Sequence, residues 1–239
     1  MENQLYFSGI SRALRAMAKD SFTIRRLASN AALEADLWHA IRTLCCLTGN
    51  NGQPVSMARR DFFPRMWIDP YTKFHPNWTY VAEVKSAVVA YLTGCPDTAR
   101  FSRNKLFYCT LPLLMETFLP RYRMNPDSRR FFRQALGLEK NAEQCFTRDI
   151  QLEVKRKYPA HLHINVDADF RGQGVGRRLI ETYTCDLRAN GIPGVHLYCG
   201  PDPVAFYLRV GFQRLGSAAF RGTQVYALGL LIEGAGGIL

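Results

Sequence analysis

A short run of alternating glycines is the segment of this sequence most suited to binding chemistry. Residues 171–176 (Arg-Gly-Gln-Gly-Val-Gly) stand between an alternating segment that predicts a strand and a segment with a helical apolar face. A glycine-rich turn at a helix N-terminus exposes backbone N–H groups, and the helix dipole adds positive potential there. Glycine is needed because a Cβ would block the close approach of a ligand. The pattern therefore predicts a site for an anion such as a pyrophosphate.

Two better-known phosphate-binding motifs do not fit this run. No Gly-Lys-Ser/Thr follows it, so it is not a Walker A loop. Its glycines are too closely spaced for a dinucleotide fingerprint, and no acidic residue ends the next expected strand. Arg177 and Arg178 follow in the first helical turn, where a positive charge opposes the helix dipole. Their placement makes more sense if they face phosphates.

The rest of the chain predicts a mixed α/β order of elements. Alternating or β-branched segments predict strands over residues 22–27, 78–84, 86–93, 161–167, 194–199 and 224–232. Apolar residues at helical spacing predict helices over 30–47 (with Asn30 as cap), 55–66, 177–189 and 203–210. The Pro- and aromatic-rich residues 69–76 are expected to form a loop. Residues 104–145 carry no strand signal and predict a helical insertion with a turn at 124–127.

Composition indicates a globular protein with a strong positive charge. The chain has 239 residues, of which 47% are hydrophobic, and 31 Lys and Arg against 20 Asp and Glu give a formal net charge of +11. Such a field favours anionic partners, although a solvated basic surface explains it equally well. The longest uncharged runs, Val88–Cys95 and Val225–Ile232, are too short to span a bilayer, so no membrane is expected as a partner.

The cysteines and the first residues bear on compartment and domain organisation. The seven cysteines form no CxxC pair and no cluster with zinc spacing, so we expect free thiols, no metal site and a reducing compartment. We therefore expect a cytoplasmic location, with a nuclear one left open. Residues 1–9 resemble a protease-cleavable linker. We expect residues 10–239 to form one domain with a helical insertion over about 101–150.

The glycine turn and a later segment together resemble the GNAT acetyltransferase superfamily. The superfamily's acetyl-CoA motif, R/Q-x-x-G-x-G/A, is met at 171–176, and its later F-Y-x-x-x-G-F signature at 206–212. More narrowly, the chain is similar to the acetyltransferase-like subgroup related to the C-terminal domain of O-GlcNAcase. The segments that carry this second resemblance are Cys46–Gly49, Pro70–Tyr71, Tyr91–Thr98 and Tyr158–Ile164.

The resemblance implies an α/β GNAT fold and a coenzyme A site. The fold would be a central mixed, twisted sheet of about seven strands, flanked by helices, whose fourth and fifth strands (161–167 and 194–199) splay apart. Acetyl-CoA would enter the gap, with its pantetheine along the fourth strand and its diphosphate on the glycine turn. The implied cofactor-binding residues are Val166, Asp167, Arg171, Gly172, Gln173, Gly174, Val175, Gly176, Arg177 and Phe206.

The resemblance also implies a proton donor, Tyr207. In this superfamily a tyrosine at that position often protonates the departing CoA thiolate; the alternative is a packed aromatic residue. A base is needed too, because an alkyl amine with a pKa near 10.4 is neutral only about once in 2,500 molecules at pH 7. His163 is our first candidate, with a structural histidine as the alternative. Asn165 stands where relatives often carry Asp, and an amide cannot be a base.

The resemblance implies an N-acetyltransferase that moves an acetyl group from acetyl-CoA to an amine. Residues 50–76 and 104–145 are expected to cover the acceptor pocket, which suggests that the amine is a small molecule. Asp97 and Tyr71 would face the acceptor, or be a turn cap and a packed loop aromatic respectively. The alternative is an inactive acyl-CoA-binding or protein-interaction module. Nucleic acid is not expected as a partner, because only the charge supports it. A homodimer is left open.

Overall fold

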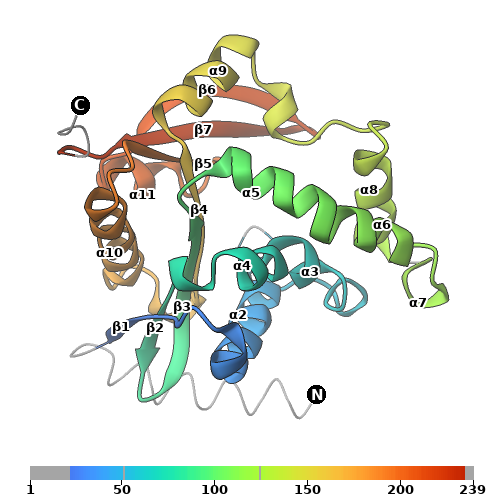
Figure 1. Cartoon of the computed structure of the whole chain (residues 1–239), viewed down its shortest axis with the longest axis horizontal. Coiled ribbons are helices and arrows are strands. Elements are labelled where there is room, and N and C mark those ends of the chain that lie inside the picture. The colour runs from blue at the N-terminus through green and yellow to red at the C-terminus, as the bar shows by residue number, and fades with distance from the viewer. Residues whose placement is uncertain (1–21, 51, 124, 235–239) are drawn as a thin grey trace.

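The computed structural model describes residues 22–50, 52–123 and 125–234 of the chain, which excludes the expected linker at 1–9. A seven-stranded mixed sheet runs through the molecule in the order β1-β2-β3-β4-β5-β7-β6 (Figure 1). The strands are β1 Thr23–Arg26, β2 Thr79–Val84, β3 Ala87–Cys95, β4 Ala160–Val166, β5 Gly194–Cys199, β6 Gln213–Phe220 and β7 Thr223–Leu231. The β4–β5 pair is parallel and the other neighbouring pairs are antiparallel.

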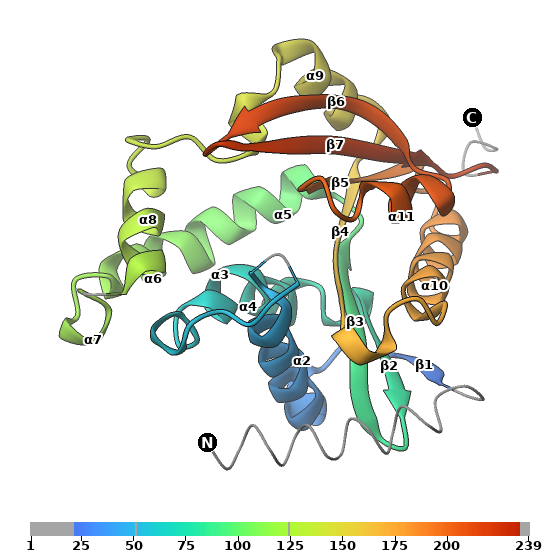
Figure 2. The ribbon, with the colours of Figure 1, turned by 180° about the vertical axis from the view of Figure 1, so that it is seen from behind.

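Helices cover both faces of the sheet. The helices are α2 Ala35–Thr48, α3 Phe63–Trp67, α4 Asp69–Phe74, α5 Thr98–Lys105, α6 Leu111–Glu116, α7 Pro120–Arg123, α8 Pro126–Ala135, α9 Arg148–Lys157, α10 Val175–Ala189 and α11 Val204–Arg209. In Figures 1 and 2, α10 and α2 lie on opposite sides of β2, β3 and β4. The apolar faces of α10 and α2 belong to two separate cores, one on each side of these strands.

Close packing ties α10 to the strands that form the site. Tyr183 of α10 is fully buried, and its hydroxyl donates to the carbonyls of Cys95 (3.0 Å) and His161 (2.9 Å). A Cβ at Gly94 would lie 2.5 Å from the Tyr183 ring, so glycine is required on β3 at this point. This anchor fixes the helix that follows the glycine turn against β3 and β4.

The β4 and β5 strands separate after a short stretch of pairing, as expected. Their register contains only Ala160↔Val195 and His161↔His196, although β4 continues to Val166 and β5 to Cys199. Beyond His161, the side of β4 that faces β5 therefore has no strand partner among the described residues. The separation opens the centre of the sheet to a ligand.

Most of the expected elements are present, and three expectations are wrong. Residues 55–66 do not form one helix: a single 3-10 turn at Met57–Arg59 precedes α3, which begins at Phe63. Residues 69–74 form the helix α4 rather than a loop, with Pro70 in the first turn, where its fixed φ suits a helix. Strand β6 was not expected; its mixed exposure gives no clean alternation, and it pairs with β7 alone. The insertion is helical as expected (Figure 2), and Asn125 caps α8.

Candidate active site

The glycine turn lies at the surface, and its backbone N–H groups are not bonded to carbonyl groups of the described chain. Residues 171–174 are exposed, and within the described chain none of the amides of 172–176 donates to a backbone carbonyl. Gly172 and Gly174 have φ values of +76° and +83°, which L side chains rarely adopt. Gly174 is the N-cap of the 15-residue helix α10. Free N–H groups and the helix dipole thus meet at one point, as an anion site requires.

A cavity of about 690 Å³ extends from this turn toward α11. Its walls come from the open edge of β4, the glycine turn, the 200–203 loop and α11. They are Gly52, Ile164, Asn165, Val166, Phe170, Arg171, Gly172, Gly174, Val175, Gly176, Arg177, Gly200, Pro201, Asp202, Pro203, Phe206, Tyr207, Arg209, Val210 and Thr223. Ten of the cofactor-binding and catalytic residues expected from the sequence therefore line one cavity. Gln173 and Asp167 are not in the lining.

The open edge of β4 presents backbone groups to the cavity. The Asp167 amide donates to Val89 O at 2.9 Å, so this residue bonds toward β3. Backbone bonding alternates along an antiparallel strand, which turns the groups of Ile164 and Val166 away from β3 and toward the open side. Asp167 itself caps the next turn, where its carboxylate accepts from the Asp169 amide. Its role in the structure is to shape the turn.

Arg171 holds the glycine turn against two other segments. Its Nε donates to Val166 O at 3.1 Å, and its Nη2 donates to Gly52 O at 3.1 Å. The Val166 carbonyl is therefore occupied, which leaves the Val166 N–H as the free backbone donor of that residue. Gly52 becomes part of the cavity wall beside this contact. Gly52 was not expected from the sequence, because only the fold brings it to Arg171.

Tyr207 and Phe206 enter the cavity from α11. Tyr207 is 8% exposed and packs against the rings of Phe206 and Phe212, with centroids 5.1 and 5.5 Å away. Burial raises the pKa of the Tyr207 phenol, and the neighbouring Cys199 thiol raises it further. The phenol therefore stays protonated at neutral pH. Phe206 also approaches Gly176 so closely that a Cβ there would be 3.1 Å from its ring.

His163 and Asn165 form a hydrogen-bonded group with Tyr91. Asn165 Nδ2 donates to Tyr91 Oη at 2.6 Å and lies 3.2 Å from His163 Nε2, which is also 3.1 Å from Tyr91 Oη. Trp67 stacks on the His163 ring with centroids 5.9 Å apart. Burial lowers the pKa of His163 to about 4, with a smaller contribution from Lys105. Asn165 reaches the cavity, whereas His163 does not line it.

The two residues expected to face the acceptor lie outside the cavity. Tyr71 is buried, shares a 2.7 Å hydrogen bond with His161 Nε2 and stacks on Phe101. The Asp97 carboxylate accepts from the Arg100 amide at 2.9 Å and so caps α5. Their contacts match the packed-aromatic and cap alternatives. His161 has a second hydrogen bond, 2.8 Å long, between Nδ1 and the Thr98 hydroxyl.

The enclosed histidines predict loss of stability in acid. Burial lowers the pKa of His161 well below its usual range and that of His163 to about 4. The unfolded chain binds these protons near pH 6.5, so the free energy of unfolding should fall as pH drops from about 6.5 to 4, by at most about 1.4 kcal/mol per pH unit for each histidine. Urea unfolding at several pH values measures this slope. His163→Gln should make it shallower, and an unchanged slope in this variant would contradict the assignment.

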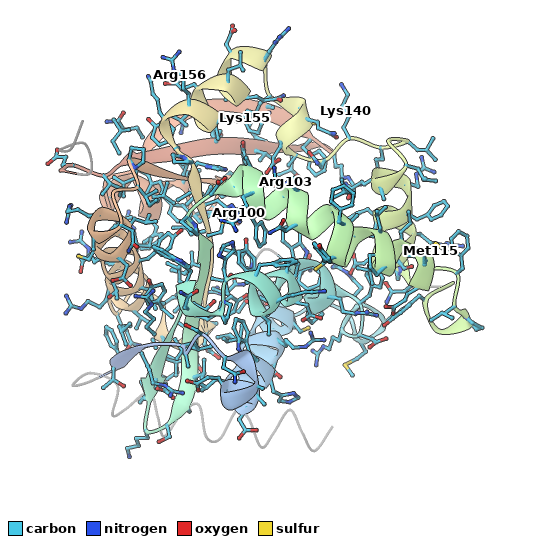
Figure 3. All side chains as sticks on the ribbon, viewed as in Figure 1. Arg100, Arg103, Met115, Lys140, Lys155 and Arg156 are labelled. Atoms are coloured by element: carbon cyan, nitrogen blue, oxygen red, sulfur yellow. The ribbon has the colours of Figure 1, made fainter. Side chains whose placement is uncertain are left out.

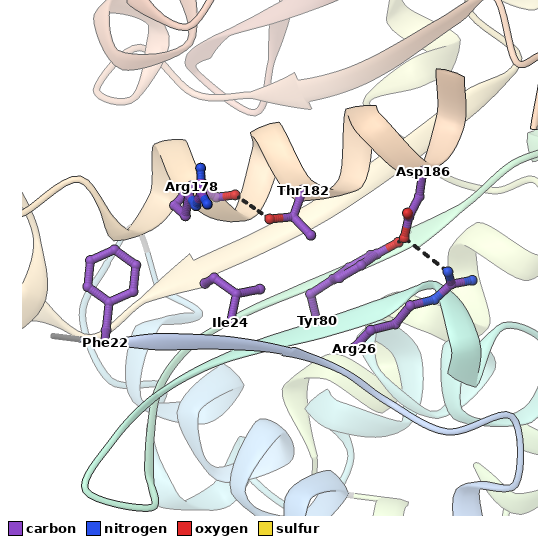
Figure 4. A pocket seen from close by; sticks show the side chains of 7 residues that line it. All are labelled: Phe22, Ile24, Arg26, Tyr80, Arg178, Thr182 and Asp186. Carbon is purple, nitrogen blue, oxygen red and sulfur yellow. Dashed lines mark hydrogen bonds and ion pairs between the residues drawn. The ribbon is translucent and has the colours of Figure 1, made fainter. Parts of the chain in front are cut away.

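A second cavity, of about 540 Å³, lies between β1, β2 and α10 (Figure 4). It is lined by Phe22, Ile24, Arg26, Tyr80, Arg178, Thr182 and Asp186. Asp186 accepts from Tyr80 Oη at 2.5 Å and pairs with Arg26 at 3.1 Å, while Thr182 donates to Arg178 O at 2.9 Å. These polar groups already satisfy one another, unlike the amides of the glycine turn.

Two further kinds of site were sought in the described residues. No group of three His, Cys, Asp or Glu side chains there could hold a metal ion. None of the helices in the described ranges has the length and apolar composition needed to cross a bilayer.

Comparisons with known proteins bear on the fold of the chain. Residues 139–214 match the family model described as an acetyltransferase (GNAT) domain. Among solved structures, SsHAT is similar with a TM-score of 0.68 and 25% identity, over 89% of this chain and 98% of its own. An apo agmatine N-acetyltransferase (TM-score 0.53, 14% identity) covers 89% of this chain and 100% of its own. A Drosophila melanogaster polyamine N-acetyltransferase (0.54, 14%) covers 88% and 100% respectively. The chain therefore has the GNAT fold, and its residues 139–214 match the acetyltransferase domain of that superfamily.

Proposed function

We propose that this chain is an acetyl-CoA-dependent N-acyltransferase in which an amine attacks directly in a ternary complex. The observation that carries the proposal is the 690 Å³ cavity that joins the free amides of residues 172–176 to Tyr207 along the open edge of β4. Acetyl-CoA supplies a thioester whose carbonyl carbon is the site of attack. An anion cradle at one end of the cavity and a proton donor at the other fit such a molecule.

The backbone does most of the binding in this proposal. The amides of 172–176 and the α10 dipole hold the diphosphate, and Arg177 adds positive charge at the cavity wall. The Val166 N–H points to the open side of β4, because Asp167 bonds toward β3 and the β4–β5 pairing ends at His161. This N–H can donate to the developing oxyanion of the thioester carbonyl.

The proton transfers in this proposal depend on the side chains in and beside the cavity. Tyr207 remains protonated and donates its proton to the departing sulfur, and the proton that the acetylated nitrogen loses returns through water to the Tyr207 phenolate. Asn165 is held by Tyr91 and His163 through its Nδ2, so its Oδ1 can accept a hydrogen bond from the attacking amine. His163 is a weak base with a pKa of about 4, which makes proton abstraction from an alkylammonium strongly uphill. We therefore infer that the amine enters already neutral.

The pH dependence of the reaction tests this inference. From pH 6 to 9, kcat/KM for an alkyl amine should rise about tenfold per pH unit, because the neutral fraction of the amine rises at that rate below its own pKa. His163 is already neutral throughout this interval, so no break should occur near pH 6.5. Initial rates at saturating acetyl-CoA give the profile. A break near pH 6.5 that disappears in His163→Gln would make His163 the base after all.

A direct assay tests the proposed function itself. The chain is incubated with acetyl-CoA and a panel of primary amines, and both released thiol and acetylated product are measured. Thiol release that depends on the amine, with product of the corresponding mass, supports the transferase. Thiol release without product would indicate hydrolysis only.

One observation favours a second function, an inactive acyl-CoA-binding module. Among the described residues of β4, Asn165 lines the cavity, and its neighbour His163, which lies outside the lining, is only weakly basic, so this strand supplies no strong base. An acyl-CoA-binding module without activity would need only the glycine turn and the β4 edge. Tight CoA binding without Tyr207-dependent turnover would favour that module. Relation to the O-GlcNAcase-like subgroup stays a prediction from the motifs.

A further inference from the structure

Lys105 lies on the face of α5 that is turned toward β4. Residues Thr98, Phe101 and Lys105 are spaced by three and four positions, so they share one side of the helix. Thr98 bonds to His161 at 2.8 Å, and the Phe101 ring lies 5.1 Å from the His161 ring. Lys105 therefore lies on the side of α5 that carries the contacts to His161 of β4.

The Lys105 ammonium has no hydrogen bond or ion pair within the described residues, although the side chain is partly buried. Desolvation lowers its pKa, and Glu143 opposes this from beyond ion-pair distance. Lys105 in turn lowers the pKa of both His161 and His163. The Lys105 ammonium therefore lies near the polar face of β4 without a direct counter-ion, and the histidines of that face, His161 and His163, are neutral.

Several neighbouring side chains are also positive, and Asp97 and Glu143 are the acidic groups among them. Burial lowers the pKa of His75, which contacts Phe101, and Arg100 of α5 lowers this pKa further. In Figure 3, Arg100 and Arg103 project from α5, and Lys155 and Arg156 project from α9. None of these four side chains forms an ion pair within the described part of the chain. The positive potential of these side chains disfavours an acceptor that carries several positive charges.

We propose that Lys105 binds the carboxylate or phosphate of an acceptor molecule whose amine reacts in the cavity. This inference rests on the proposed function and narrows it to amines that also carry an anionic group. Polyamines, the acceptors named for one structural neighbour, would meet the Lys105 cation at this point. Anion binding would give the buried ammonium the charged hydrogen-bond partner that it lacks.

Matched acceptors measure this preference. The pairs are phosphoethanolamine with ethanolamine, and 4-aminobutyrate with butylamine, and putrescine serves as the dication. The wild-type chain should prefer the anionic member of at least one pair, and which pair shows the preference distinguishes phosphate from carboxylate. Lys105→Met should lower kcat/KM for the preferred anionic acceptor about 10- to 100-fold, mainly through KM, and leave its neutral partner within about twofold. Lys105→Arg should retain most of the preference.

Arg103→Met is the matched control, because Arg103 is an exposed cation on the same helix. It should leave the preference unchanged. Preference for putrescine over every anionic acceptor would overturn the inference, as would an equal loss with both members of a pair in Lys105→Met.

A binding experiment distinguishes failure of the Lys105 inference from failure of the proposed function. If CoA binds but no amine is acetylated, the proposed function fails, and Lys105 is then tested by NMR of the His163 ring in the CoA complex. Phosphoethanolamine or 4-aminobutyrate should shift this signal in the wild type and not in Lys105→Met. Equal shifts in both proteins, or none in the wild type, would contradict anion binding by Lys105.

Discussion

Gly174→Val should weaken CoA binding about 100-fold or more while the chain still folds. Gly174 has a φ of +83°, and a Cβ there would meet no protein atom within 4 Å. Since Gly174 lines the cavity, the added side chain would occupy space at the mouth of the anion site. The β-branched residue would also disfavour the left-handed conformation, by about 1–2 kcal/mol, and so misdirect the adjoining amides. Titration calorimetry with CoA measures the loss.

A control variant separates local strain from loss of the site. Gly137 follows α8 with a φ of +70°, and a Cβ there also meets nothing within 4 Å. Gly137→Val therefore imposes a similar backbone penalty away from the cavity, and it should leave CoA affinity unchanged. Pantetheine, which lacks the diphosphate, should bind the wild type and Gly174→Val about equally. An unchanged affinity of Gly174→Val for CoA would remove the glycine turn from the site.

Local sequence signals predict the elements that hold the cavity. The glycines of the turn, the alternation along 161–167 and the apolar face of 177–189 each report a local conformation, and the structure has the corresponding turn, strand and helix. These signals need no information about distant residues. The separation of β4 from β5 was expected from the family resemblance rather than from any residue pattern.

Long-range contacts could not be predicted in this way. Gly52 enters the cavity only through Arg171, 119 positions away, and Tyr91 meets Asn165 only because β3 and β4 are paired in one register. Low basicity of His163 arises from its enclosure and from Lys105, which lies on a helix of the insertion. Edge strand β6 has few buried positions, so its local pattern is weak. Such features follow from tertiary packing, so they cannot be predicted from the spacing of residues in the sequence.

Tyr207→Phe should lower kcat about 10²- to 10⁴-fold, because the variant keeps the ring and loses the proton that the departing thiolate needs. The ring contacts with Phe206 and Phe212 remain, so the fold and the affinity for acetyl-CoA should change little. Burial raises the pKa of the Tyr207 phenol, so the wild-type group stays a proton donor into the alkaline range. Steady-state rates and acetyl-CoA binding, measured on the same preparation, separate the two effects.

Tyr226→Phe provides the comparison for this loss. Tyr226 lies on β7, pairs in register with Cys199 and does not line the cavity, so removal of its hydroxyl should leave kcat unchanged. A kcat of Tyr207→Phe within about threefold of the wild type would make Tyr207 a packing residue. The thiolate would then take its proton from solvent, which the position of a buried phenol at the cavity wall argues against. A large loss of kcat with intact acetyl-CoA binding would instead separate an active transferase from an acyl-CoA-binding module, because binding alone does not need the phenolic proton.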